Sequence, residues 1–213
     1  MIIKTILGLF LSYLFGSFPT GYVAGKILKN IDIRDFGSGN MGATNVLRVL
    51  GKGPGALVLV IDIVKGVVPT VFLADMLGLS SNLHRVLFGL MAVAGHNWTV
   101  FLNFKGGKGI ATGLGVLLGL TVKIVSLRGV FGLTIAVWLG VFLASGYVSL
   151  SSLAAATSLP LWMVVFGQPL ELILLGIVFC IFVVIRHRSN IKRLLEGAEH
   201  RISLPFHKSK TSS

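Results

Sequence analysis

The sequence predicts an all-α membrane protein: a polytopic bundle of seven transmembrane helices, forming a single domain over residues 1–213. Of the 213 residues, 54% are hydrophobic and only 12% are charged, whereas a soluble domain is about 25% charged. The mean hydropathy is +0.90, and a chain this short has too little interior to hide so much apolar surface from water. Lipid is therefore the expected surrounding for most of the surface.

Seven apolar windows approach the length of about 20 residues that crosses the hydrocarbon core of a bilayer. They lie at residues 3–24, 54–74, 84–104, 110–127, 129–145, 148–167 and 170–186. The first is too long for a signal-peptide apolar region and lacks a cleavage site, so we interpret it as a retained span. The last four windows follow one another closely, and merging some of them would give five spans.

The placement of basic residues predicts the orientation. The chain has 19 Lys and Arg against 7 Asp and Glu. With the N-terminus outside, 14 of the 19 basic residues fall on one side, namely Lys26, Lys29, Arg34, Arg48, Lys52, Lys105, Lys108, Arg186, Arg188, Lys192, Arg193, Arg201, Lys208 and Lys210. Cytoplasmic segments carry the excess of Lys and Arg, so the C-terminus is expected in the cytoplasm. Five and seven spans both satisfy this arrangement.

A glycine-rich stretch between the first two windows has the composition of a phosphate site. Glycines let backbone N–H groups approach an anion, polar side chains add neutral donors, and a helix N-terminus adds a favourable dipole. We expect a helix to begin between Asn40 and Thr44, with Arg48 one turn later on the same face. The candidate binding residues here are Ser38, Gly39, Asn40, Thr44, Asn45 and Arg48. The alternative is a turn and helix cap, with Arg48 serving orientation only.

A second glycine-rich turn precedes the window at 110–127. It places Gly107 and Lys108 where a helix begins, but the spacing is not that of a Walker A loop, so nucleotide hydrolysis is not expected. The alternative is a tight turn between helices, with Lys105 and Lys108 reaching towards the lipid headgroups.

Polar residues inside apolar windows point to function or to helix pairing. His96 and Asn97 are expected about two turns before the end of their window, where they would touch a ligand or support the glycine-rich loops. Asp62 and Lys65, three residues apart on one helix face, are expected to neutralise each other and to fix packing.

The end of the last window and the start of the window at 148–167 supply further polar candidates. His187 and Asn190 can face one cavity if the helix continues past Arg186, and we interpret the surrounding Arg and Lys residues as a basic collar. Ser149 and Ser152 are one turn apart and could donate hydrogen bonds to a ligand or cap a helix.

Several enzyme classes are excluded by what the sequence lacks. There is no His-x-x-x-x-Asp pair, no G-x-S-x-G elbow and no H-E-x-x-H motif. Aromatic residues are not interleaved with basic ones, which argues against nucleic-acid binding. We expect no metal site and no cofactor.

Three segments nonetheless resemble the motifs of a known family: residues 16–21, residues 37–48, and His96 together with residues 104–109. The family is that of the bacterial acyl-phosphate:glycerol-3-phosphate acyltransferases (PlsY), and residues 147–152 and 187–194 match its later segments in order. The resemblance implies a seven-helix enzyme of the inner membrane with its active site on the cytoplasmic face. It implies transfer of a fatty acyl group from acyl phosphate to glycerol 3-phosphate, the first step of phospholipid synthesis.

The resemblance and the residue chemistry together give an expected division of roles. Ser38, Gly39, Asn40 and Thr44 would cradle the phosphate of acyl phosphate, while Arg48 and Lys108 would hold glycerol 3-phosphate. His187 and Asn190 would orient its hydroxyl group, and Gly107, Asn45 and Ser149 would contribute to binding. The expected partners are the two substrates and membrane lipid, with the protein acting as a monomer.

One rival function from another class remains open at this point. A membrane transporter of phosphate or of an organic phosphate would also use broken helices and glycine-rich loops. It would place its site near the middle of the bilayer, whereas the basic and glycine-rich elements here gather at one face.

Overall fold

All of the regular structure within residues 1–202, the part of the chain that this computed structural model describes, is helical. Lys208 and Lys210 lie outside the described residues. In chain order the elements are α1 (Ile2–Ser17), α2 (Thr20–Lys29), the 3-10 helix η1 (Ile33–Asp35), α3 (Ala43–Leu50), α4 (Lys52–Val68), the π-helix η2 (Pro69–Leu73), α5 (Ala74–Met76), α6 (Asn82–Asn97), the 3-10 helix η3 (Val100–Leu102), α7 (Ile110–Lys123), α8 (Leu127–Ser145), α9 (Val148–Val165), α10 (Leu170–Arg186) and α11 (Arg188–Leu195).

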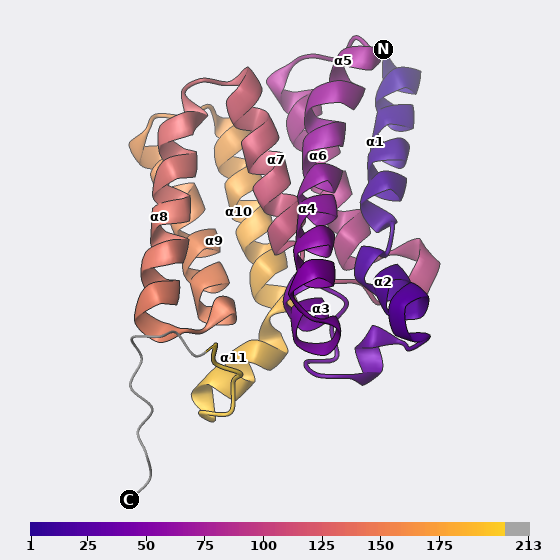
Figure 1. Cartoon of the computed structure of the whole chain (residues 1–213). Coiled ribbons are helices and arrows are strands. Elements are labelled where there is room, and N and C mark those ends of the chain that lie inside the picture. Colours follow the sequence, from indigo (N-terminus) through magenta and orange to yellow (C-terminus); the bar gives the residue numbers. More distant parts are fainter. Residues whose placement is uncertain (203–213) are drawn as a thin grey trace, which may run out of the picture.

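The long helices stand side by side in one bundle, with the N-terminus and α5 at one end and α2, α3 and α11 at the other (Figure 1). Helix α1 packs on α6, α4 on α7, and α9 on both α8 and α10. Glycines allow the closest approaches: a Cβ on Gly16 would lie 2.1 Å from the Ala92 carbonyl oxygen, and one on Gly115 would lie 1.9 Å from that of Ile63. Close contact through small residues is typical of helix packing in membranes.

The first apolar window is broken, whereas the sequence predicted one continuous span. Helix α1 ends at Ser17, and Phe18 and Pro19 separate it from α2. The expected pair on α4 holds this break: Lys65 Nζ lies 2.7 Å from Asp62 Oδ1 and donates to the Phe18 carbonyl oxygen at 2.5 Å. Both side chains of the pair are only 2% exposed. The pair therefore satisfies a backbone group that the break frees, as a helix interrupted within a membrane requires.

The third window ends earlier than expected. Helix α6 stops at Asn97 and η3 follows, so the prediction that His96 and Asn97 lie two turns inside a helix running to 104 is wrong. The Thr99 hydroxyl donates to the Ser17 carbonyl oxygen at 2.5 Å and accepts from the Phe101 N–H, which starts the tighter helix. The apolar residues of η3 keep the hydropathy high after the α-helix has ended.

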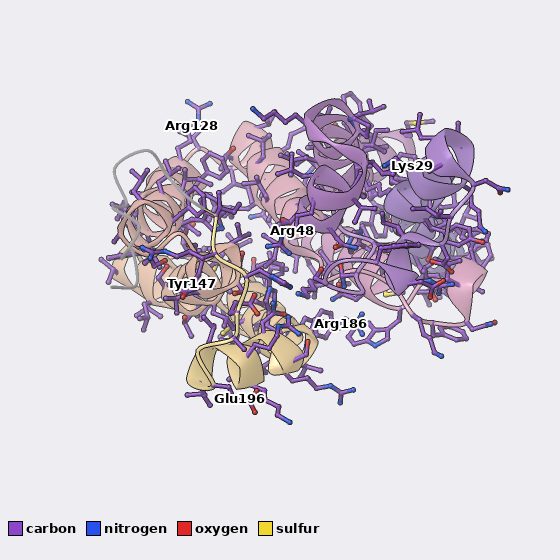
Figure 2. All side chains as sticks on the ribbon, turned by 60° about the horizontal axis from the view of Figure 1, so that its bottom comes forward. Lys29, Arg48, Arg128, Tyr147, Arg186 and Glu196 are labelled. Carbon is purple, nitrogen blue, oxygen red and sulfur yellow. The ribbon has the colours of Figure 1, made fainter. Side chains whose placement is uncertain are left out.

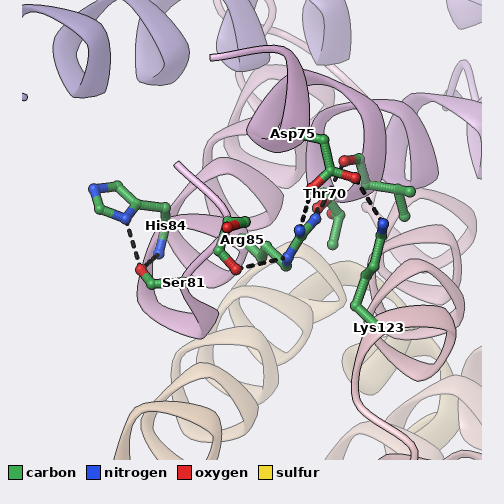
Figure 3. A network of polar contacts seen from close by, with 8 residues as sticks. Thr70, Asp75, Ser81, His84, Arg85 and Lys123 are labelled. Carbon is green, nitrogen blue, oxygen red and sulfur yellow. Dashed lines mark hydrogen bonds and ion pairs between the residues drawn. The ribbon is translucent and has the colours of Figure 1, made fainter. Parts of the chain in front are cut away.

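A polar network stabilises the end of the bundle that carries the N-terminus and α5 (Figure 3). Arg85, which is buried, donates to the Thr70 and Val71 carbonyl oxygens at 2.9 and 3.2 Å and pairs with Asp75. Lys123 pairs with the same carboxylate at 2.6 Å. Arg85 thus serves the carbonyl groups of the π-helix η2, so its role here is structural.

Four segments are long and apolar enough to cross a membrane by length and composition: Ile2–Lys29, Lys52–Met76, Leu127–Ser145 and Val148–Val165. Helices α10 and α11 together make a fifth if the pair, bent by 61°, is counted as one span. Helix α7 is apolar but only 14 residues long. Length and composition alone therefore give four or five spans within the described residues.

Candidate active site

A cavity of about 620 Å³ opens at the end of the bundle that carries α3 and α11. Nine of the eleven candidate residues from the sequence line it: Ser38, Asn40, Thr44, Asn45, Arg48, Lys108, Ser149, His187 and Asn190. The other two, Gly39 and Gly107, do not line it. Segments more than a hundred residues apart in the chain thus meet around one space, which Figure 2 views from that end.

The first glycine-rich stretch forms a loop that ends in α3. As predicted, a helix begins in the expected interval, at Ala43. The Asn40 side chain accepts from the Gly42 N–H at 2.8 Å, which shapes the turn into the helix. Asn45 is buried, accepts from the Ser38 N–H at 2.8 Å and donates to the carbonyl oxygens of two loop residues. Its amide is therefore engaged in holding the loop that presents Ser38 to the cavity.

The second glycine-rich turn is held on both sides by backbone hydrogen bonds. Gly107 N–H donates to the His96 carbonyl oxygen at 2.9 Å. From the other side, Arg186 donates to the Gly106 and Gly107 carbonyl oxygens at 2.7 and 2.9 Å. Arg186 is thus more than a member of a basic collar, because it fixes the turn that carries Lys108.

Gly107 should not tolerate a side chain. A Cβ there would lie 2.0 Å from His96 Nε2, and His96 is buried. We expect Gly107→Ala to displace Lys108 and to lower the rate of the acyl transfer that the resemblance implies at least about a hundredfold, since a displacement of about 1 Å can cost that much. Gly53→Ala, where a Cβ meets nothing within 4 Å, is the matched control. Equal rates for the two variants, measured on folded protein, would contradict this role of the turn.

Lys108, Asn190 and His187 form the polar end of the cavity. Lys108 Nζ donates to Asn190 Oδ1 at 2.5 Å. The His187 Nδ1 lies 2.8 Å from the Val183 carbonyl oxygen. Because a carbonyl oxygen only accepts, Nδ1 carries the hydrogen and Nε2 is left as an acceptor. His187 and Asn190 line the same cavity although the helix axis bends by 61° between α10 and α11.

The electrostatics of Lys108 suit an anion site. Burial lowers the pKa of the Lys108 ammonium group to about 8, the Glu199 carboxylate raises it, and the charges of Arg193, Arg48 and Arg186 lower it further. Cations gathered in a partly buried space repel one another. An anionic ligand would relieve that repulsion, and its interactions are stronger there than in water.

A carboxylate that was not among the residues predicted from the sequence, that of Glu199, also lies in this cavity. Glu199 accepts from Ser149 Oγ at 2.8 Å, from Asn190 Nδ2 at 2.6 Å and from Arg193 Nε at 2.7 Å. Ser149 is thus a donor towards the cavity, whereas Ser152 donates to the carbonyl oxygen of Val148 in its own helix. The only sequence signal for Glu199 was an acidic residue just after a basic segment.

Most of the rest of the cavity is apolar, although Lys52, His96, Thr134, Ser152 and His200 also line it. Its walls come from α4, α7, α8, α9 and α10, and its larger apolar lining residues are Leu59, Leu114, Leu117, Ile135, Trp138, Leu139, Phe142, Leu159 and Phe179. Leu59 and Leu139 are among the exposed residues of this lining. A ligand that has both a phosphate and an acyl chain would therefore fit this cavity, with its phosphate at the polar end and its acyl chain along the apolar walls.

The comparisons with known proteins agree with this chemistry. Residues 6–197 match the family model described as glycerol-3-phosphate acyltransferase. A protein of that name from Parasynechococcus marenigrum is 49% identical over 202 residues, covering 95% of this chain and 92% of the relative. Another from Gloeobacter violaceus is 47% identical, covering 91% and 93%.

Two solved structures share the fold. Both are described as PlsY (YgiH), an integral membrane glycerol 3-phosphate acyltransferase, and both are 41% identical to this chain. The glycerol 3-phosphate form has a TM-score of 0.84 and covers 93% of this chain and 96% of its own. The lysophosphatidic acid form has a TM-score of 0.81, with 93% and 95% covered. These matches favour the enzyme over the transporter, and the chain belongs to the glycerol-3-phosphate acyltransferase family of integral membrane enzymes.

Proposed function

We propose that this acyltransferase takes its acyl group from an acyl phosphate and transfers it to glycerol 3-phosphate, giving lysophosphatidic acid and inorganic phosphate. Acyl transfer to glycerol 3-phosphate is the activity of its family, and the proposal adds the identity of the acyl donor. One observation carries it: donors at the start of α3 and the cations Arg48 and Lys108 line the same cavity as the apolar walls. That arrangement offers places for two phosphates beside one acyl chain.

The structure supports a division of labour among the site residues. Ser38, Asn40 and Thr44, at the loop and first turn of α3, bind the phosphate of the acyl donor, where the helix N-terminus adds its dipole. Arg48 and Lys108 bind glycerol 3-phosphate. Gly39, whose φ is +70°, lets the loop turn, while Asn45 and Gly107 position the loops.

The reaction needs no covalent intermediate on the protein. The hydroxyl oxygen of glycerol 3-phosphate attacks the acyl carbonyl carbon, the bond between that carbon and the phosphate oxygen breaks, and the departing phosphate takes the hydroxyl proton. His187 Nε2, an acceptor, and Asn190 orient the hydroxyl group. An acyl phosphate is already activated, so positioning and stabilisation of charge by Lys108 and Arg48 account for the catalysis.

We assign seven membrane-crossing helices, α1, α4, α6, α7, α8, α9 and α10, with the N-terminus outside and the C-terminal end in the cytoplasm. In support, these helices stand side by side in one bundle, and the N-terminus lies at the end opposite to α3 and α11 (Figure 1). The basic residues of α2, α3 and α11 gather at the second end, as cytoplasmic segments do. The protein then lies in the bacterial inner membrane with its site on the cytoplasmic face. Because one chain lines the whole cavity, a monomer suffices.

Phe179 should limit the length of acyl chain that the cavity accepts. Together with Gly113, Leu117 and Leu159, it lines both the large cavity and a void of about 20 Å³ behind it. Phe179→Ala joins the two spaces. We expect the ratio of kcat/KM for a longer over a shorter acyl phosphate to rise about tenfold for two added carbons. Ile181→Ala, on the outer face of α10, is the control. An unchanged ratio would mean that the chain leaves the cavity beside Leu59 and Leu139 instead.

A donor comparison tests the proposed function. Purified enzyme is given glycerol 3-phosphate with either an acyl phosphate or the acyl-CoA of the same chain length, and phosphate and lysophosphatidic acid are quantified. We expect one phosphate released for each lysophosphatidic acid formed from acyl phosphate, and little product from the thioester. Comparable rates from both donors would overturn the assignment of acyl phosphate.

A further inference from the structure

The short segment that follows α11 turns back over the mouth of the cavity. This segment, residues 198–202, is here called the strap. Figure 2 shows it running between Tyr147 and Arg48. Ile202 N–H donates to the Gly146 carbonyl oxygen at 2.9 Å, and Arg201 Nε donates to that of Ser145 at 2.9 Å. The strap is therefore fastened to the turn between α8 and α9.

The strap places one charged group inside the cavity. The Glu199 side chain is only 6% exposed, and its carboxylate receives hydrogen bonds from Ser149, Asn190 and Arg193. Burial raises the pKa of the Glu199 carboxyl group, but these hydrogen bonds and the charge of Arg193 outweigh burial and leave it below its usual value. The group is therefore an anion at neutral pH.

This carboxylate uses donors that a phosphate would use. One of its oxygens accepts from Ser149 and Asn190 and the other from Arg193, so its two oxygens take positions open to two oxygens of a phosphate. A carboxylate and a phosphate also repel each other at short range. The Glu199 carboxylate and a phosphate therefore cannot accept from these donors at the same time without a large loss of binding energy.

Glu199 lies just beyond residues 6–197, the part of the chain that the family model matches. A carboxylate held by three donors is also a poor proton acceptor, because those hydrogen bonds stabilise its charged form. These hydrogen bonds therefore favour a competitor of the substrate over a base in the reaction.

We propose that Glu199 is an intramolecular competitor that sets the affinity of this enzyme for its phosphate substrate. Without substrate, the strap holds the carboxylate on Ser149, Asn190 and Arg193. When glycerol 3-phosphate binds, its phosphate, held by Arg48 and Lys108, also takes Ser149 and Arg193, and its hydroxyl group takes Asn190. This displaces Glu199 together with the strap. Apparent affinity then depends on the fraction of molecules in which the donors are free. The inference rests on the proposed function, since it takes glycerol 3-phosphate as the ligand of this polar end.

Steady-state kinetics of Glu199→Gln test the proposal, with Glu196→Gln as the matched control. Glu196 lies three residues earlier and is exposed, and among the described residues its carboxylate makes only a distant ion pair, to Lys192 at 3.8 Å. If the donors are free in about one molecule in ten, removing the competing charge lowers the KM for glycerol 3-phosphate about tenfold. The value of kcat stays within about twofold, inorganic phosphate inhibits more strongly, and Glu196→Gln matches wild type. A lower kcat with an unchanged or higher KM would overturn the proposal, because it would make Glu199 part of the reaction.

A second variant separates the strap from the charge. Arg201→Ala removes the hydrogen bond to Ser145 and should also lower the KM by loosening the strap. In the double variant with Glu199→Gln, loosening should have no further effect, since the competing charge is already gone. Additive effects on KM would contradict a shared mechanism. Wild-type turnover in the same assay distinguishes a failure of this proposal from a failure of the proposed function, which would abolish turnover in every variant.

Discussion

Replacing Lys108 with methionine should lower kcat for acyl transfer at least about a hundredfold. The ammonium group lies at the polar end of the cavity, 2.5 Å from Asn190 Oδ1, where the proposed reaction gathers the charge of two phosphates. Removing one such charge-stabilising group from a preorganised site typically costs between about a hundredfold and a thousandfold in rate. Methionine keeps the length and apolar stem of lysine, so the loss reports on the charge. Initial rates with acyl phosphate and glycerol 3-phosphate measure it.

Lys105→Met is the matched control, because Lys105 lies in the same turn but is exposed and outside the cavity. It should keep its rate within about twofold of wild type. The pH profile gives a second check. With a pKa of about 8, Lys108 is charged below that pH and loses its charge above it, so kcat/KM should fall as pH rises through about 8. Equal losses in the two variants would show that the charge acts only on orientation in the membrane.

Asp62→Asn should cause the largest loss of stability among single substitutions of charged residues in the bundle. Asp62 and Lys65 are each 2% exposed, and the Asp62 carboxylate also accepts from Thr20 Oγ1 at 3.0 Å. Asparagine cannot balance the Lys65 charge, and removing one partner of a buried pair typically costs about 3 to 5 kcal/mol. The break between α1 and α2 loses support at the same time. Thermal unfolding of the detergent-purified protein should show a clearly lower Tm.

The control for this loss is Asp32→Asn. Asp32 pairs with Arg34 at 2.6 Å, but both side chains are partly exposed, and such pairs are typically worth about 0 to 1 kcal/mol. A Tm for Asp62→Asn close to that of Asp32→Asn would mean that water reaches the Asp62 pair and that the break at Phe18 is stabilised by other contacts.

The fold was predictable where local signals were strong. The windows at 129–145, 148–167 and 170–186 agree closely with α8, α9 and α10, because Gly146 and Pro169 mark the turns between them. The predicted helix bounds were wrong where the ends of an apolar window differ from the ends of an α-helix. Pro19 interrupts an apolar window and splits it, while the apolar residues of η3 prolong a window beyond the end of α6 at Asn97. Hydropathy measures affinity for lipid and does not report where an α-helix ends.

The candidate site shows the same division between local and distant information. The start of α3 and the pairing of Asp62 with Lys65 follow from short spacings, so the sequence predicted both. Glu199 reaches Ser149 across 50 residues, and Arg186 reaches Gly106 across 80. No local pattern encodes such contacts, since they depend on how the helices pack and on the bend between α10 and α11.

A structure of this enzyme with glycerol 3-phosphate bound tests the central claim, that one cavity brings the polar residues of α3, of the turn before α7, of α9 and of α11 to the substrate. We expect the phosphate within hydrogen-bonding distance of Lys108 and Arg48, with Glu199 withdrawn from Ser149 and Asn190. A phosphate bound elsewhere, with Glu199 and Lys108 keeping their present partners, would contradict the account.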